Sequence, residues 1–336
     1  MRRFLVFSPI LAAAVAACSS SSSSSAGPGD AAATDASTAE SSAGDASSPT
    51  PDAGDDGALP PWAPDATPAD AAAIVAARPY ILHVPTGYDP TKRTPLVVMF
   101  HGYGATGAVE DGYMGLTPTS DAHGFLYAYS DGTLDQDGKR FWNATDGCCD
   151  LYGVPVDDVA YFNAIVDDVS AKYDVDPHQI YVIGHSNGGF MGHRLACEPG
   201  SRVAAIVSLA GAVWNDPSKC APSSPVSILE VHGDADQTII YTGGTTKEGT
   251  YPGVTTTVAT WASKESCTGT LAPTGQTLSI DSTQPANATI VETYGGCPAG
   301  VDVQHWKMVG SGHIPGLESP TWGDLVWGFL SAHPRP

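Results

Sequence analysis

Basic side chains are scarce in this sequence. Its 336 residues include 15 Lys and Arg against 36 Asp and Glu, which gives a formal net charge of -21. Proteins bind nucleic acids through clustered cations, so this balance argues against a nucleic-acid partner. The sequence also lacks Cys and His residues at the spacing of a metal site, and it lacks a glycine-rich loop of the phosphate-binding kind. We therefore expect neither a metal nor another cofactor.

The apolar stretch near the start of the chain is too short to cross a bilayer. Phe4–Ala17 has 14 residues, follows two arginines and ends in small side chains. This pattern predicts a signal peptide over residues 1–17. The tetrad Val15–Cys18 resembles a bacterial lipobox, in which the cysteine after the cleavage site carries a diacylglyceryl group. The resemblance implies an extracellular or cell-surface protein anchored to a bacterial membrane through a lipid on Cys18; the alternative is an ordinary secretory signal with an incidental cysteine.

Large apolar side chains are also nearly missing from the segment that follows. Residues 19–61 consist mainly of Ser, Ala, Asp, Gly, Thr and Pro, and residues 19–76 contain nine acids and no Lys or Arg. Such a chain cannot bury enough surface to offset its conformational entropy. We expect a lipidated, disordered linker over 18–76 and one folded domain over 77–336.

The folded part alternates between short apolar runs and segments with helical spacing. Such alternation predicts an α/β domain with a mostly parallel central sheet and helices on both faces. Ligands bind such sheets at the carboxyl ends of the strands. We expect strands over 80–84, 95–100, 125–129, 179–183, 203–209, 226–231 and 301–309, and helices over 157–173, 187–196, 255–266 and 322–332.

A serine lies in a tight bend between an expected strand and an expected helix. Gly184–Gly188 reads G-x-S-x-G with Ser186 at its centre. The glycines leave room for a strained turn, which lifts the serine hydroxyl above the sheet and next to a helix N-terminus. The motif in this context predicts that Ser186 is a nucleophile.

A serine nucleophile needs a histidine base and an acid, which follow it along the chain in this motif. We prefer His313 as the base because it lies on a glycine-rich loop between the last strand and the last helix. The acid follows the strand that ends at Val231, and it is Asp234 or Asp236. The other histidines downstream of Ser186 are His232, His305 and His333.

An acyl transfer site also needs donors for the oxyanion. One comes from the residue after the nucleophile and one from the loop after an earlier strand. These rules nominate the backbone N–H groups of Asn187 and Tyr103. His101, at the head of the same loop, is assigned to substrate binding.

Seven ordered motifs occur in the folded part of the chain. They are HGYGATG at His101–Gly107, HGFLYAYSDGT at His123–Thr133, RFWNA at Arg140–Ala144, VDDVAYFNAIVDDV at Val156–Val169, GHSNGGFM at Gly184–Met191, HGDADQTIIY at His232–Tyr241 and GSGHIPG at Gly310–Gly316. Together, from about Tyr80 to the C-terminus, they resemble the bacterial polyhydroxybutyrate-depolymerase-like esterases, which include the feruloyl and acetylxylan esterases of carbohydrate esterase family 1.

This resemblance implies an α/β-hydrolase fold and hydrolysis of an ester through an acyl-enzyme. It places the catalytic acid at Asp236 and implies that Trp142 and Tyr241 lie near the substrate, although Trp142 is equally well explained as a core aromatic. Relatives often carry a Trp in the loop after the catalytic histidine. Here the loop reads His-Ile-Pro-Gly from His313, so an aromatic wall for a feruloyl ring is missing there.

Six cysteines remain besides Cys18, an even number that suggests disulfides in an exported chain. Sequence proximity and the family resemblance favour Cys197–Cys220 and Cys267–Cys297. The adjacent Cys148 and Cys149 form either a vicinal bridge or two thiols.

The leading hypothesis is therefore a secreted serine esterase. Its substrate is a polymer: feruloyl or acetyl esters of plant polysaccharide, or a polyester such as polyhydroxybutyrate. An acyltransferase of the cell envelope would use the same acyl-enzyme. A non-catalytic surface binding protein on a hydrolase scaffold and a peptidase are further alternatives.

Overall fold

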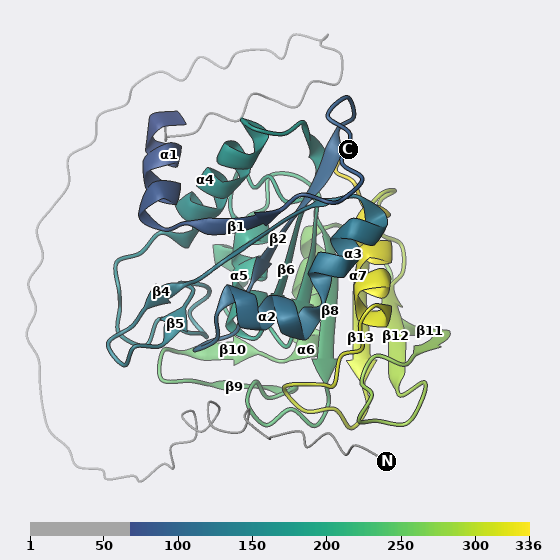
Figure 1. Cartoon of the computed structure of the whole chain (residues 1–336). Helices are drawn as coiled ribbons and strands as arrows, with labels where there is room; N and C mark the ends of the chain where they lie inside the picture. The colour runs from purple at the N-terminus through teal and green to yellow at the C-terminus, as the bar shows by residue number, and fades with distance from the viewer. Residues whose placement is uncertain (1–67) are drawn as a thin grey trace, which may run out of the picture. The chain divides into compact units, whose positions relative to one another are not determined.

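A computed structural model describes residues 68–336 of the chain. The chain divides into two units, Met1–Pro64 and Asp65–Pro336, and the second contains the fold (Figure 1). The expected signal peptide, the lipidated Cys18 and most of the expected linker lie outside the described residues. Among residues 68–336, the helices are too short or too polar to cross a membrane.

A nine-stranded sheet forms the centre of the domain. Its middle strands are parallel, whereas the first and the last two pair antiparallel with their neighbours. In spatial order the strands are β1 (Tyr80–His83), β3 (Leu126–Ser130), β2 (Thr94–Phe100), β6 (Val175–His185), β7 (Ala205–Leu209), β8 (Ser227–Gly233), β13 (Val303–Met308), β12 (Thr289–Tyr294) and β11 (Leu271–Leu278).

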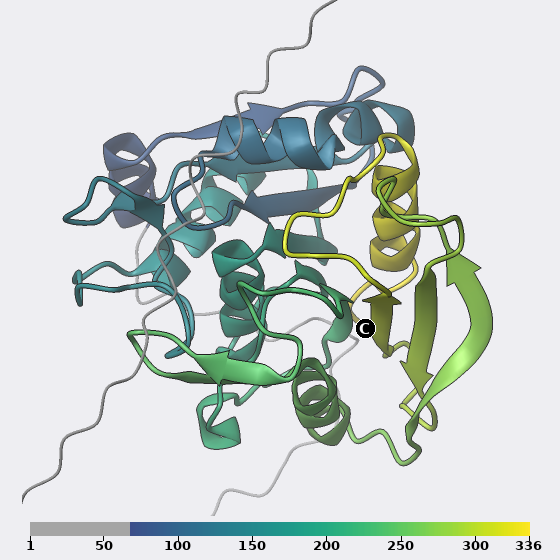
Figure 2. The ribbon, with the colours of Figure 1, turned by 90° about the horizontal axis from the view of Figure 1, so that it is seen from below.

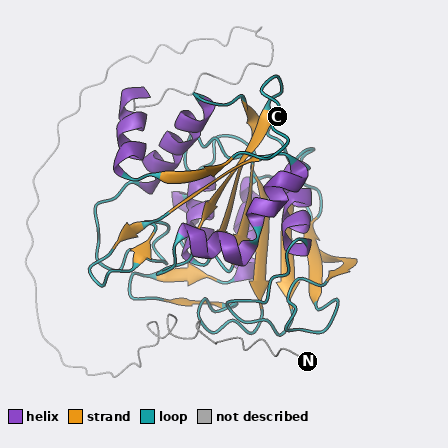
Figure 3. Ribbon diagram, in the orientation of Figure 1, coloured by secondary structure: helices purple, strands orange, loops and turns teal. Residues whose placement is uncertain are grey.

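Helices cover both faces of this sheet because its central strands are apolar on both sides (Figures 2 and 3). In β2, Val98 faces one core and Val97 and Met99 face the other. One face packs against α1 (Pro68–Ala77), α4 (Asp158–Ser170), α5 (Asn187–Cys197) and α6 (Val254–Lys264); the other packs against α2 (Gly107–Met114), α3 (Leu116–His123) and α7 (Thr321–Ser331). The prediction of a mostly parallel sheet between helical layers is confirmed.

The folded domain begins earlier than the sequence predicted. Residues 68–76 were assigned to the linker, but they belong to α1, which starts at Pro68 and packs on α4. Proline is well tolerated in the first helical position, and the alanines that follow favour a helix. Arg78, directly after α1, forms an ion pair of 2.6 Å with Asp158 of α4. This contact attaches the alanine-rich segment to the domain.

The antiparallel end of the sheet was not predicted. Residues of the outermost strand, β11, are mostly exposed, and Pro273 and Gly275 interrupt its regular pairing with β12. Two small hairpins, β4 (Thr133–Leu134) with β5 (Arg140–Phe141) and β9 (Gly243–Thr245) with β10 (Thr250–Pro252), also went unpredicted.

The six cysteines within residues 68–336 pair as three bridges. Cys197 is bonded to Cys220 and Cys267 to Cys297, which are the pairs favoured from the sequence. Cys148 is bonded to its neighbour Cys149. The Cys197–Cys220 bridge attaches a loop to the end of α5, and the Cys267–Cys297 bridge joins the loop after α6 to the loop after β12.

Candidate active site

Ser186 lies in the sharp turn between β6 and α5. Its φ of 54° is in the left-handed region that side chains avoid, so the backbone is strained there. Two hydrogen bonds hold the turn: the Ser186 N–H donates to Leu209 O at 2.7 Å, and Ser186 O accepts from the Phe190 N–H at 3.0 Å. A β-carbon on Gly184 would overlap the carbonyl of Gly188. Only glycine fits at that position of the motif.

A chain of two hydrogen bonds joins Ser186 to the two partners expected from the sequence. His313 Nε2 is 2.9 Å from Ser186 Oγ, and His313 Nδ1 is 2.7 Å from Asp236 Oδ2. Asp236 follows β8 and His313 follows β13, which is the parallel neighbour of β8. The loops at the carboxyl ends of these strands therefore meet.

The surroundings of His313 and Asp236 determine their protonation states. Burial lowers the pKa of His313 below its ordinary value, although the bond to Asp236 opposes the effect. The ring is therefore neutral at neutral pH. Burial raises the pKa of Asp236, but hydrogen bonds from His232 and His313 outweigh burial and lower it. The Asp236 carboxylate also accepts the N–H groups of Thr238 and Ile239 at 2.7 and 3.0 Å.

Asp234, the other acid left open by the sequence, has a different role. Its carboxylate accepts the Gly310 N–H at 2.7 Å and lies 3.3 Å from Lys307 Nζ. It thus ties the loop after β8 to the loop after β13. Of the remaining histidines, His305 is buried against Glu292 at 2.8 Å and His333 contacts the carbonyl of Phe329 at 2.7 Å.

The loop after β2 lies beside the turn that carries Ser186. A β-carbon on Gly102 would meet the Ser186 side chain at 3.5 Å. The Gly102 N–H donates to the buried carboxylate of Glu110 at 3.1 Å. Within residues 68–336, the backbone N–H groups of Tyr103 and Asn187 have no acceptor. The positions of the two nominated donors are compatible with an oxyanion site.

The side chain of Asn187 has a role that the sequence did not indicate. Its Oδ1 accepts the Trp142 N–H at 2.7 Å, and its Nδ2 donates to Trp142 O at 3.0 Å. The amide thus fixes the segment around Trp142 to the residue that follows Ser186. Both partners are buried.

Two of the predicted substrate-binding residues belong to the core instead. His101 is fully buried; its Nδ1 bonds to Gly102 O at 2.7 Å and its Nε2 accepts the Gly132 N–H at 2.8 Å. Trp142 is also fully buried, and its indole N–H donates to His101 O at 3.0 Å. With their polar atoms paired in the interior, both side chains shape the loops and are not available to a substrate.

The third, Tyr241, is half-buried beside the residues that support Asp236. Its ring packs edge-on against His232 at 5.8 Å and lies 5.7 Å from the ring of His305. Sequence reasoning missed His185, which links the loop of His313 to Glu110 on α2. Its Nε2 is 3.0 Å from His313 O, and its Nδ1 is 3.3 Å from Glu110.

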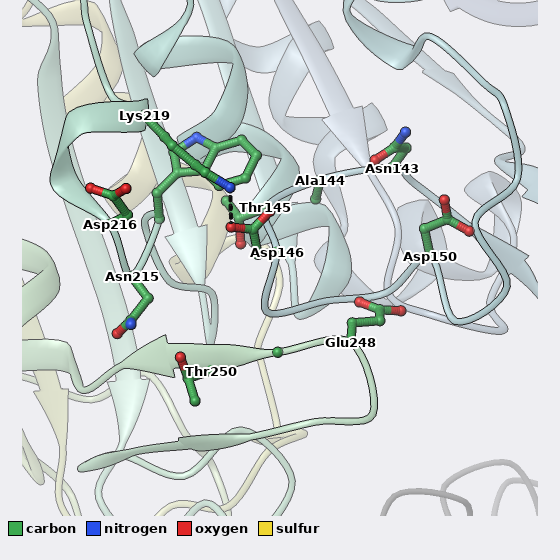
Figure 4. A pocket seen from close by; sticks show the side chains of 12 residues that line it. Asn143, Ala144, Thr145, Asp146, Asp150, Asn215, Asp216, Lys219, Glu248 and Thr250 are labelled. Carbon is green, nitrogen blue, oxygen red and sulfur yellow. Dashed lines mark hydrogen bonds and ion pairs between the residues drawn. The ribbon is translucent and has the colours of Figure 1, made fainter. Parts of the chain in front are cut away.

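A polar cleft of about 620 Å³ has Asn143, the residue after Trp142, in its wall (Figure 4). Glu248 lies on the wall of this cleft, and its pKa is raised to about 8. Burial is the main cause, and the negative charge of Asp150 adds to it. The buried indole N–H of Trp214 and one oxygen of Glu248 have no partner among residues 68–336. The lining consists of Asn143, Ala144, Thr145, Asp146, Asp150, Trp214, Asn215, Asp216, Lys219, Glu248, Gly249 and Thr250.

The family model for the alpha/beta hydrolase fold matches residues 95–256, a span that includes Ser186 and Asp236. Together with the sheet order and the strand-end loops, this match establishes the class: the chain has the α/β-hydrolase fold. The acetyl xylan esterase of Aspergillus awamori has the same fold, with a TM-score of 0.52 and 16% identity over 75% of this chain and 93% of that one.

Two curated proteins extend the likeness in sequence. The chain is 35% identical over 176 residues to a protein described as an esterase, NocK, of Nocardia uniformis subsp. tsuyamanensis, over 51% of this chain and 49% of that protein. It is 28% identical over 271 residues to feruloyl esterase B of Piromyces equi, over 77% of this chain and 46% of that protein. The chain thus spans about half the length of the curated relatives it matches.

Proposed function

We propose that the protein is a serine hydrolase of carboxylic esters. The observation that carries the proposal is the hydrogen-bonded chain from Ser186 Oγ through His313 to Asp236. In this reaction Ser186 Oγ attacks the ester carbonyl while His313 Nε2 takes its proton. The N–H groups of Tyr103 and Asn187 stabilise the oxyanion.

The same groups carry out the remaining steps, in which His313 acts first as an acid and then again as a base. The imidazolium of His313 gives its proton to the departing alcohol, which leaves an acyl group on Ser186. His313 then takes a proton from water, whose hydroxide attacks the acyl carbonyl. Collapse releases the acid and returns the proton to Ser186. Asp236 stays ionised throughout and balances the charge on the ring.

The variant Ser186→Ala tests the proposal. We expect its hydrolysis of p-nitrophenyl acetate to fall by about 10⁴-fold or more, with an unchanged circular dichroism spectrum. Ser208→Ala is the matched control, because Ser208 is a buried serine of β7 whose hydroxyl has no partner within residues 68–336. Turnover by Ser186→Ala at the rate of Ser208→Ala would refute the mechanism.

We further propose that the substrate is an ester of a plant polysaccharide, with a feruloyl or acetyl group as the acyl part. The names of the relatives support this, since they include a feruloyl esterase and a bifunctional acetylxylan esterase/xylanase of Neocallimastix patriciarum, to which this chain is 24% identical over 74% of its length and 33% of that protein's. We assign the polar cleft to the alcohol part of the substrate, because its lining suits an alcohol rich in hydroxyl groups better than an apolar polyester such as polyhydroxybutyrate.

A substrate panel separates these possibilities. We expect faster turnover of acetylated or feruloylated xylo-oligosaccharides than of polyhydroxybutyrate. Trp214→Ala should raise KM for the oligosaccharide esters about fivefold, as expected for a lost aromatic contact, and leave KM for p-nitrophenyl acetate unchanged. Tyr152→Ala, which removes an exposed aromatic outside the cleft, is the control. A preference for the polyester would overturn the choice of substrate but not the esterase mechanism.

We also propose that the protein is exported and anchored through a lipid on Cys18. The lipobox-like tetrad before Cys18 supports this. In a bacterial host, the full chain should label with radioactive palmitate and sediment with membranes, whereas Cys18→Ala should do neither. Equal labelling of both chains would refute lipidation at this residue.

A further inference from the structure

Glu230 is a fully buried carboxylate in the middle of β8, two strands from the nucleophile. A charge in such a position is costly unless its environment pairs it. Glu230 Oε2 is 2.9 Å from His193 Nε2 on α5, and Glu230 Oε1 is 3.3 Å from His232 Nδ1. Both histidines are buried, so the three side chains form an internal cluster.

The hydrogen-bond partners of His193 determine which of its ring nitrogens carries the proton. An indole N–H can only donate, and Trp261 Nε1 lies 2.9 Å from His193 Nδ1. His193 Nδ1 must therefore be the acceptor, so the ring is neutral and its proton is on Nε2, facing Glu230. One side of the Glu230 carboxylate is thus occupied by a neutral donor.

The partners of His232 require a proton at Nε2. This nitrogen is 2.9 Å from the carbonyl of Ile239 and 3.3 Å from Asp236 Oδ2, and both groups accept hydrogen bonds. The other nitrogen faces the carboxylate of Glu230. If Glu230 is ionised, His232 carries protons on both nitrogens and is an imidazolium between two carboxylates.

The electrostatics agree with this assignment. Burial lowers the pKa of His232, but its hydrogen bonds to Asp236 and Glu230 outweigh burial and raise it to about 9. Burial raises the pKa of Glu230, but bonds from His193 and His232 more than offset it and lower the pKa. The ionised pair is therefore the stable form at neutral pH.

Few other charged or titratable groups face His232. Tyr241 packs edge-on against the ring, with His305 of β13 behind it, and Lys307 Nζ lies 5.5 Å from the Tyr241 ring centre. His313 and His232 share one acceptor, Asp236 Oδ2, and, in addition to burial, the charge of His232 lowers the pKa of His313.

We propose that Glu230 is a positioning residue for the catalytic acid: it keeps His232 doubly protonated, and His232 fixes both the Asp236 carboxylate and the backbone of its loop at Ile239. The cation also reduces the negative charge that His313 experiences. The base consequently stays neutral, and able to accept a proton, down to a lower pH than an isolated His–Asp pair would allow.

Glu230→Gln tests this without changing the shape of the cluster. The Gln oxygen must face the fixed N–H of His193, so its amide donates to His232 Nδ1, and His232 becomes neutral while it keeps the bond to Ile239 O. His232 and His313 share the acceptor Asp236 Oδ2, whereas Glu230 is bonded to the opposite nitrogen of His232, so loss of the pair removes more repulsion on His313 than attraction. The acid limb of kcat/KM for p-nitrophenyl acetate should move up by about one pH unit.

Glu292→Gln is the matched control. Glu292 pairs with His305 in the same manner on β12, but within residues 68–336 it has no hydrogen bond to the Asp236 loop. Its acid limb should stay at the wild-type position. A Glu230→Gln limb that is unchanged or moves to lower pH would overturn the proposal, because a merely structural role for Glu230 would lower activity without moving the profile.

A second measurement needs neither a variant nor turnover. In ¹⁵N-histidine-labelled wild-type protein at pH 7, both ring nitrogens of His232 should give the NMR signature of protonated nitrogen; a single protonated nitrogen would overturn the proposal. The inference rests on the proposed function only for its kinetic test. Failure to hydrolyse any ester would refute the function, while the NMR experiment still decides the state of His232.

Discussion

The reactive side chains owe their properties to the backbone that holds them. Ser186 adopts a conformation that its own side chain disfavours, and the hydrogen bonds of the turn keep it there. His313 is buried enough to stay neutral but close enough to Asp236 to accept a proton. At this scale, single polar contacts decide whether the site is assembled.

The Asn187 amide offers a test of one such contact. Asn187→Ala leaves the Trp142 N–H and carbonyl buried without these partners, which should cost about 1–3 kcal/mol of the free energy of unfolding. It also releases the segment next to the oxyanion site, so kcat should fall even though the backbone N–H at position 187 remains. Urea denaturation and kcat for p-nitrophenyl acetate measure the two effects. Wild-type stability would show that the amide bonds are not important to the fold.

At the scale of the elements, the close contact between α5 and β2 fixes the position of the turn that carries Ser186. α5 begins directly above the carboxyl end of β2, and at Gly188 there is no space for a side chain because a β-carbon would overlap the carbonyl of Phe100. One turn further on, a β-carbon on Gly192 would have its nearest neighbour, Val182 Cγ1, at 3.5 Å, which is an ordinary van der Waals contact. Among the glycines of this helix, Gly188 is therefore obligatory and Gly192 is replaceable.

This difference predicts opposite outcomes for the same substitution. Gly188→Ala should prevent folding or lower Tm strongly, since the obstacle is backbone. Gly192→Ala should be neutral or stabilise the protein by about 0.5–1 kcal/mol, because alanine is the better helix former. Thermal unfolding of the two variants checks this. Similar Tm values would mean that α5 can shift away from β2.

The elements also show where sequence reasoning works. Strands β2, β7 and β8 were predicted because they are buried on both faces and read as apolar runs. β11 was missed because its residues are exposed and polar, and α1 because its composition continues that of the linker. In such segments tertiary contacts, not local pattern, determine the structure.

At the scale of the molecule, several buried groups make stability depend on pH in one direction. The pKa of Glu248 is raised to about 8 by burial and the charge of Asp150, and that of Glu265 to about 7 by burial, partly offset by the Val226 N–H. An acid whose folded pKa is raised contributes stability that is lost as pH rises through the interval between its unfolded and folded values. His232, with its pKa raised to about 9, contributes stability that is complete below about 6.5 and is lost as pH rises through 9.

We therefore expect Tm to decline as pH rises from about 6.5 toward 9, because Glu248, Glu265 and His232 all lose stabilising free energy in this range. Glu248→Gln, which stays neutral at every pH, should flatten part of this decline. Differential scanning calorimetry of the full chain across this range measures both profiles. A wild-type Tm that rises steadily to pH 9 would contradict the assignment of these buried groups.

The site as a whole was only partly accessible from sequence. The G-x-S-x-G motif indicated Ser186, chain order and loop position indicated His313, and the family resemblance indicated Asp236. Glu230 was not singled out, although an acid in the apolar run of β8 is itself a signal of a buried partner. Glu230 contacts His193 of α5, which in turn accepts a hydrogen bond from Trp261 of α6, so the cluster joins residues far apart in the chain and only the fold reveals it.

The outer strand of the sheet has a consequence for crowded conditions. An exposed edge strand can pair with a second copy of the protein through its unpaired backbone N–H and C=O groups. In β11 a proline removes one N–H donor, and the pairing with β12 is irregular around Pro273 and Gly275. Pairing of two molecules along β11 should therefore be disfavoured even where many copies are crowded together.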